Sequence, residues 1–160
     1  MQVTVKVPGS CGELIQGMRN QKHFLITCPI NCYSVVTLES STTPGITVKA
    51  PQQEKIIKAI HKTMEYFGLP DTRGYRLTVD SDLTVGKGMA SSTADMTGAI
   101  IACTLSEGLS ISYEELSRIL IAIGPLRFSR HSGRDVLLEL GEADLAVSVD
   151  VGTALADGAD

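Results

Sequence analysis

The chain has 160 residues, of which 43% are hydrophobic and 20% are charged, and its formal net charge is -4. This length supports one domain with an apolar core but not two ordinary domains. The negative charge argues against a general nucleic-acid or anionic-membrane surface, and no run of about 18 apolar residues could span a bilayer. We therefore expect a cytoplasmic domain without nucleic-acid or membrane partners; no signal peptide precedes the first strand-like alternation.

Four cysteines raise the question of a disulfide framework or a zinc site. Cys28 and Cys32 are separated by three residues, but no second Cys or His pair completes a zinc-binding pattern. We therefore expect Cys11, Cys28, Cys32 and Cys103 to be buried or loop thiols in a reducing compartment.

The first fifty residues are typical of strands. Gln2 to Val7 alternates with a period of two, and Pro8-Gly9-Ser10 is predicted to end that strand. Further strands are expected at Glu13–Gln16 and His23–Thr27, as the arms of a hairpin joined by Arg19–Lys22, and at Cys32–Glu39 and Gly45–Ala50.

The following residues change to helical periodicity. Gln52 to Phe67 places its apolar residues on one helical face, and Gly68 and Pro70 end that helix. A strand at Tyr75–Val79 precedes a helix at Ser91–Glu107, and a capping box of Ser112 and Glu115 starts another helix that runs to about Ile123. This order predicts an α+β fold, with a mostly antiparallel sheet and the helices on one face.

The segment from Val85 to Asp95 is the most informative part of the chain. Two glycines allow close backbone approach to a ligand, and the helix that follows offers unpaired N–H groups and a partial positive charge. These are the features of a phosphate site, although the segment is not a Walker A loop. The alternative is an ordinary strand-to-helix turn with Ser91 or Ser92 as N-cap.

A second unusual segment, Pro8 to Gly17, follows the first strand. It combines a thiol and an acid with proline and glycine breaks in a predicted tight turn. The alternative is a structural turn in which Glu13 is solvated and Cys11 is packed.

Together, the two segments resemble the GHMP kinase superfamily. The strings Ser-Cys-Gly-Glu-Leu-Ile-Gln-Gly and Gly-Met-Ala-Ser-Ser-Thr-Ala-Asp are most similar to the branch that phosphorylates L-threonine in cobalamin biosynthesis. The resemblance covers roughly residues 1–123 and implies the family's N-terminal, ATP-binding domain, of the ribosomal-protein type of fold. It also implies transfer of a phosphoryl group from ATP, with Mg²⁺, to the hydroxyl of L-threonine.

By this resemblance, individual residues acquire expected roles. Lys87 would neutralise negative charge on the transferring phosphoryl group, and Ser92 would help to hold Mg²⁺. Asp95 would assist the metal or Lys87. The alternative is that Asp95 is simply an acid in the first helical turn, where the helix dipole favours it. Ala90 replaces the usual second glycine, which is tolerable if the φ of Ala90 is negative. The expected substrate cleft comprises Ser10, Cys11, Gly12 and Glu13. The expected ATP phosphate site comprises Val85, Gly86, Lys87, Gly88, Met89, Ala90, Ser91, Ser92 and Thr93.

The resemblance breaks after Ile123. The family's acidic segment, which supplies a carboxylate for Mg²⁺, corresponds here to Ile123-Gly124-Pro125-Leu126-Arg127-Phe128-Ser129, which has no acid. Codons compatible with Leu126–Val136 permit a change of reading frame near Pro125. We therefore expect residues 124–160 to be a divergent, frameshifted tail and the family's C-terminal domain to be absent. Within this tail, Glu139–Asp160 should show low order or non-native packing, with weak strand character around Ala146–Val151. Sequencing the gene tests the frameshift.

The sequence leaves three functions open. The first is a truncated and impaired L-threonine kinase, or another GHMP kinase such as a homoserine kinase. The second is a catalytically inactive nucleotide-binding module, since the acidic segment has lost its carboxylates. The third is an RNA-binding domain of the ribosomal-protein type, which the net charge of -4 opposes.

Overall fold

The computed structural model of the chain describes residues 1–19, 22–123 and 148–152. The elements in these residues, in chain order, are β1 (Gln2–Arg19), β2 (Lys22–Ser41), β3 (Gly45–Lys49), α1 (Gln53–Phe67), β4 (Gly74–Ser81), α2 (Ser91–Ser106), α3 (Tyr113–Ile123) and β5 (Ser148–Gly152). None of the helices in this part of the chain is long and apolar enough to cross a bilayer.

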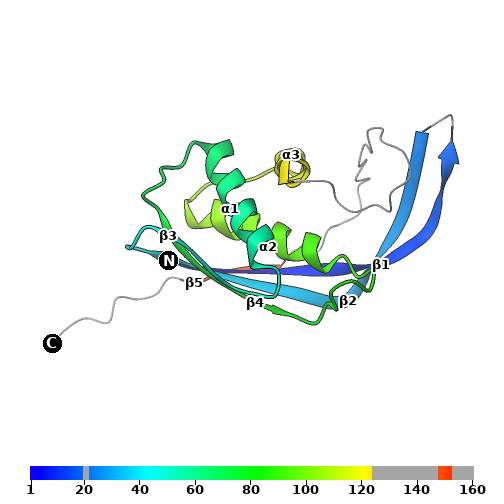
Figure 1. Cartoon of the computed structure of the whole chain (residues 1–160), viewed down its shortest axis with the longest axis horizontal. Helices are drawn as coiled ribbons and strands as arrows, with labels where there is room; N and C mark the ends of the chain where they lie inside the picture. Colours follow the sequence, from blue (N-terminus) through cyan, green and yellow to red (C-terminus); the bar gives the residue numbers. More distant parts are fainter. Residues whose placement is uncertain (20–21, 124–147, 153–160) are drawn as a thin grey trace.

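The strands form one sheet in the order β3-β4-β2-β1-β5. Neighbouring strands are antiparallel except for β3 and β4, which are parallel. The three helices lie on the same side of the sheet (Figure 1). The predicted α+β architecture, with a mostly antiparallel sheet and helices on one face, is therefore confirmed.

Helix α2 lies at the centre of the helical layer. It contacts β1 and β2 on one side and α1 and α3 on the other. Every residue from Ala94 to Thr104 is consequently buried. By contrast, α1 buries one stripe that includes Ile56, Ile60 and Met64, as its helical periodicity predicts.

The predicted break at Pro8-Gly9-Ser10 is wrong, because β1 continues through these residues to Arg19. The ladder between β1 and β2 instead shifts register between Pro8 and Ser10 and again between Cys11 and Ile15. Irregularities of this kind accept a proline, which lacks an N–H donor, without ending the strand. The segment expected to form a tight turn is therefore a bulged strand.

The predicted hairpin exists, but its arms are longer than expected. The distal parts of β1 and β2 continue past the helices as a two-stranded arm (Figure 1). Residues 20–21, at the predicted turn, lie outside the described part of the chain.

The expectation of buried or loop thiols is confirmed for Cys103 but not for Cys11 and Cys28. Cys103 is buried in α2, but Cys11 and Cys28 are exposed and lie on strands, not in loops. Cys32 is half-buried.

The weak strand character expected around Ala146–Val151 is confirmed by β5, which pairs with Gln2–Lys6 of β1. Residues 124–147 and 153–160 lie outside the described part, and with them the altered acidic segment after Ile123.

Candidate functional site

The loop between β4 and α2 has an alternating backbone conformation. Gly86, Gly88 and Ala90 have positive φ values of 78°, 74° and 56°, whereas Lys87 and Met89 between them do not. A backbone in which positive and negative φ values alternate can turn successive N–H groups toward one concave side, an arrangement that suits anions. The side chains from Val85 to Gly88 are exposed, so the loop is open to solvent.

This loop ends at the N-terminus of α2. The N-cap is Ala90, and no side chain caps the helix. The alternative of Ser91 or Ser92 as N-cap is therefore wrong, and the condition of a negative φ at Ala90 is not met. Because the first N–H groups of a helix have no intrahelical partners, an uncapped start leaves donors and a partial positive charge beside the loop.

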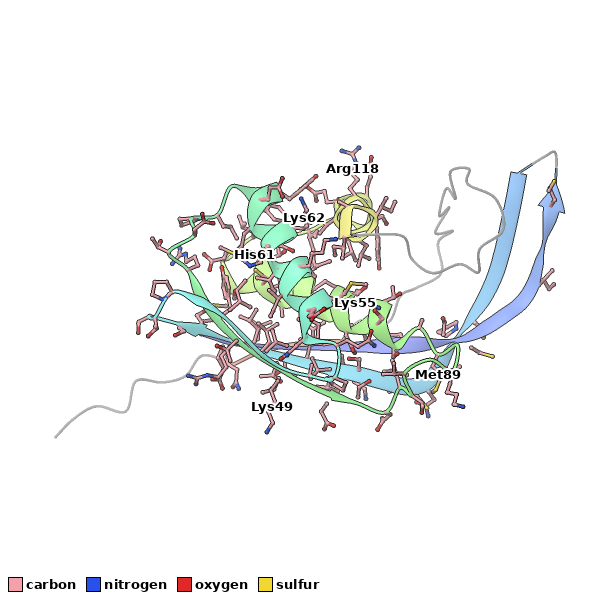
Figure 2. All side chains as sticks on the ribbon, viewed as in Figure 1. Lys49, Lys55, His61, Lys62, Met89 and Arg118 are labelled. Carbon is pink, nitrogen blue, oxygen red and sulfur yellow. The ribbon has the colours of Figure 1, made fainter. Side chains whose placement is uncertain are left out.

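The structure brings together the two segments that the sequence singled out. The backbone N–H of Ser10 on β1 donates to the carbonyl oxygen of Met89, at 3.2 Å. Gly9 makes this approach possible, because a Cβ atom there would lie 2.8 Å from the Met89 oxygen. Figure 2 shows Met89 in the loop near the point where the β1–β2 arm leaves the sheet.

A lysine from another helix reaches the start of α2. Lys55 of α1 donates through Nζ to Oγ of Ser92, at 2.9 Å. The sequence did not indicate this residue, because only the packing of α1 against α2 brings it there. Lys55 belongs to the polar face of α1, which in the sequence alone reads as a solvated surface (Figure 2).

Asp95, one turn further along α2, is buried, with 4% of its surface exposed. Its carboxylate accepts a hydrogen bond of 2.6 Å from Oγ of Ser34 on β2. Burial raises the pKa of Asp95, while the Ser34 hydrogen bond and the charge of Lys55 oppose that rise. Asp95 therefore faces Ser34 and the field of Lys55, and it is not a solvated first-turn acid.

Ser34 is a second residue that sequence reasoning missed, although a signal existed. It is fully buried and shares the inward face of β2 with Val36 and Leu38. A serine in phase with inward apolar residues needs a polar partner, because an unpaired buried hydroxyl is costly. That partner is Asp95.

The remaining expected site residues are distributed around the loop. Lys87 is exposed, Ser91 is buried, and Ser92 and Thr93 are half-buried. In the expected substrate cleft, Cys11 is exposed and Ser10 is half-buried. The side chain of Glu13 and the surroundings of Gly12 lie outside the described part.

The donors near the loop suit a metal carried mainly by a ligand's phosphate oxygens. Within the described residues, no three His, Cys, Asp or Glu side chains form a metal-binding group. Mg²⁺ bound to phosphates commonly keeps several waters and takes only one or two protein oxygens. Ser92, with Asp95 one turn away, could provide one or two such oxygens. These residues do not form a metal site composed of protein ligands alone.

The sheet, its single helical layer and the glycine-containing loop at the start of the central helix define a class of α+β domain. The family model for the N-terminal domain of GHMP kinases matches residues 54–140, which is more than half of the chain. The chain therefore belongs to the GHMP kinase family, through its N-terminal domain.

Two curated relatives are similar in sequence. The L-threonine kinase of Salmonella typhimurium is 31% identical over 118 residues, which is 74% of this chain and 38% of the relative. The L-threonine kinase of Citrobacter freundii is 30% identical over 118 residues, 74% of this chain and 40% of the relative. The chain thus spans about two fifths of the length of these relatives.

Solved structures show the same fold. A D-glycero-D-manno-heptose 1-phosphate kinase from Bacteriodes thetaiotaomicron superimposes with a TM-score of 0.61 at 16% identity. The likeness covers 76% of this chain and 47% of that kinase. At this identity the likeness concerns the fold alone.

Proposed function

We propose that this chain forms the ATP phosphate-binding part of a kinase that phosphorylates the hydroxyl of L-threonine. The observation that carries the proposal is the loop from Val85 to Ala90, whose alternating left-handed residues lead directly into the uncapped N-terminus of α2. Such a loop offers backbone N–H donors to phosphate oxygens without rearrangement. The acceptor alcohol rests on the names of the two curated relatives.

Kinases of this kind work by positioning and electrostatic stabilisation more than by covalent chemistry. The backbone of residues 86–92 would hold the phosphates, and Lys87, on the exposed side of the loop, would neutralise charge on the transferring group. Mg²⁺, when bound, would offset the negative charge of the phosphates. Ser92 would contribute its hydroxyl to that metal. The segment Ser10 to Glu13 would border the substrate, because Ser10 is fixed to the loop through Met89.

Lys55 extends this assignment. Its ammonium group lies 2.9 Å from the Ser92 hydroxyl, at the positive end of α2. A phosphate seated on the loop would therefore meet a second cation from α1, in addition to Lys87. Asp95, tied to Ser34, would keep the Lys55 side chain directed toward the start of α2 by charge attraction.

A nucleotide-binding module without activity is the second candidate. It is favoured by the sequence Ile123-Gly124-Pro125-Leu126-Arg127-Phe128-Ser129, which has no acid where the resemblance calls for a metal-binding carboxylate. One hydroxyl does not replace a charged ligand for Mg²⁺. This candidate also requires ATP binding and lacks only the transfer step.

Calorimetric titration with ATP, in the presence and absence of Mg²⁺, tests the shared part of both candidates. Lys55→Met should weaken ATP binding about tenfold, because it removes a charge-assisted contact worth roughly 1.5 kcal/mol. Ser92→Ala should weaken binding of the Mg²⁺ complex more than that of free ATP. Lys62→Met is the matched control, since Lys62 lies two turns along the same helix and pairs with Glu65.

The proposal fails if the wild-type chain does not bind ATP at millimolar concentration. It also fails if Lys55→Met and Lys62→Met give the same affinity as the wild type. An unchanged Mg²⁺ dependence in Ser92→Ala would remove only the assignment of Ser92.

A further inference from the structure

The ladder between β1 and β2 contains two cysteines directly opposite each other. Cys11 and Cys28 are Cα partners in antiparallel register, and both are free and exposed. Side chains of directly opposed residues project from the same face, with Cβ atoms about 4.5–5.5 Å apart. A disulfide requires Cα atoms roughly 4.4–6.8 Å apart and Cβ atoms about 3.5–4.5 Å apart. The pair therefore needs only a small adjustment to form a bond, and that bond would carry some strain.

The pair lies in an unusual stretch of the ladder. Cys11↔Cys28 and Ser10↔Pro29 form a short paired stretch with a register shift on either side. Pairing of such a short stretch is weakly specified, because register shifts interrupt the ladder before and after it. A covalent link between the two strands would fix this register.

The same stretch contacts the candidate phosphate loop. Ser10, the neighbour of Cys11, donates its backbone N–H to the carbonyl oxygen of Met89. Gly9 lets the two backbones approach. Cys11 is thus adjacent to the residue whose hydrogen bond holds the loop, so a change in the mobility of β1 at Cys11 should affect that hydrogen bond.

The other two cysteines are in different situations. Cys103 is fully buried, and burial raises the pKa of its thiol to about 12, so it is unreactive near neutral pH. Cys32 is half-buried and lies within a register shift, without a cysteine opposite. Among the four thiols, only Cys11 and Cys28 combine exposure with facing positions.

We propose that Cys11 and Cys28 are a redox modification site, which forms a reversible cross-strand disulfide by exchange with a low-molecular-weight disulfide of the glutathione type. One cysteine thiolate attacks a sulfur of the oxidant, whose S–S bond breaks and releases one thiolate. The second cysteine thiolate then attacks the mixed disulfide, forms the Sγ–Sγ bond and releases the other thiolate. The protein loses two electrons, the oxidant gains them, and the two protein thiol protons pass to the released thiolates.

The bond has two expected consequences. Because it is exposed and strained, it should be reduced readily and should serve as a switch, not as a permanent staple. Because it fixes the strand that carries Ser10, oxidation should stabilise the contact with Met89 and restrain the loop. Restraint of the loop does not depend on the proposed function. Only an effect of that restraint on ATP binding would rest on the proposed function.

The test treats the reduced chain with oxidised glutathione, then alkylates free thiols and maps disulfides by mass spectrometry. The wild type should lose two alkylatable thiols, link the peptides of Cys11 and Cys28, and recover both thiols with dithiothreitol. Cys32→Ser should form the same link. Cys11→Ser should form no internal link and retain only a mixed disulfide at Cys28. Glutathione on each cysteine without a link, or a link to Cys32, would overturn the proposal.

Amide hydrogen exchange without nucleotide gives the second readout. Exchange of the Ser10 N–H should be slower in the oxidised wild type than in the reduced wild type, and it should not change in oxidised Cys11→Ser. Equal exchange in both wild-type states would overturn the link to the loop. If the disulfide forms and Ser10 is protected while neither state binds ATP, the redox site stands and the proposed function fails.

Discussion

At the scale of single residues, the residue that precedes α2 has an unfavourable backbone conformation. Ala90 adopts a φ of 56°, a conformation that costs an L-residue with a Cβ atom roughly 1–2 kcal/mol. The surrounding structure maintains it, because the carbonyl oxygen of Ala90 accepts the first helical hydrogen bond from Ala94, at 2.9 Å. Strain of this kind is often stored at functional sites, which agrees with the position of Ala90 in the loop.

Ala90→Gly should therefore raise the free energy of unfolding by about 1 kcal/mol, because glycine accepts positive φ without the steric cost. Urea denaturation followed by circular dichroism measures the change. Ala99→Gly, in the interior of the same helix, should have the opposite sign, since glycine there costs about 1 kcal/mol or more. A destabilised Ala90→Gly variant would contradict the strain at this position.

Asp95 predicts a dependence of stability on pH. Burial raises its pKa in the folded state above the ordinary value of 3.8, so the folded chain binds more protons than the unfolded chain above that pH. Its contribution to stability should therefore be fully present at lower pH and decline as pH rises through the folded-state pKa. In Asp95→Asn, urea midpoints measured from pH 4 upward should lack this decline. An identical pH profile in variant and wild type would refute it.

At the scale of elements, α2 packs unusually close to the sheet. A Cβ atom at Gly98 would lie 2.6 Å from Cγ2 and 3.0 Å from Cβ of Val36 on β2. Val36 is fully buried and β-branched, so it cannot turn aside. The small residue thus sets the spacing between the helical layer and the sheet, and with it the contact between Asp95 and Ser34.

Two effects oppose each other in Gly98→Ala. Alanine improves helix propensity by about 1 kcal/mol, whereas overpacking a core costs roughly 1–3 kcal/mol. We expect packing to prevail and the variant to lose about 1 kcal/mol in urea denaturation. In a Val36→Ala background the same substitution should cost less, because the Cγ2 contact at 2.6 Å is gone and only the Cβ contact at 3.0 Å remains. If Gly98→Ala stabilises the otherwise wild-type chain, α2 does not pack against Val36 as closely as the distances indicate.

At the scale of the whole molecule, we expect the chain to retain ATP binding while it loses transfer of the phosphoryl group. The loop and α2 form one unit, whereas the acidic residues that the resemblance calls for after Ile123 are missing from the sequence. We expect ATP binding with little or no ADP release in an assay with L-threonine, ATP and Mg²⁺. Robust turnover would show that the missing acids are not needed.

Much of the fold followed from local patterns. The apolar stripe of Ile56, Ile60 and Met64 predicted α1, and the capping box was confirmed, because Glu115 accepts from the backbone N–H of Ser112 at 2.8 Å. Such features depend on neighbours within one helical turn, so the sequence carries them directly. The strand interruption at Pro8 was predicted wrongly, since its outcome depended on pairing with the distant Tyr33.

By itself, the sequence determined the class of fold, the family resemblance and the distinctive segment from Val85 to Asp95, because each depends on consecutive residues or on their period. Only the tertiary structure decided that Ser10 bonds Met89, that Lys55 reaches Ser92 and that Cys11 faces Cys28. These pairs are far apart in the chain, and their distances are fixed by strand register and by the packing of α1 and α2 over the sheet. Local propensity contains no information on strand register or on the packing of helices over a sheet.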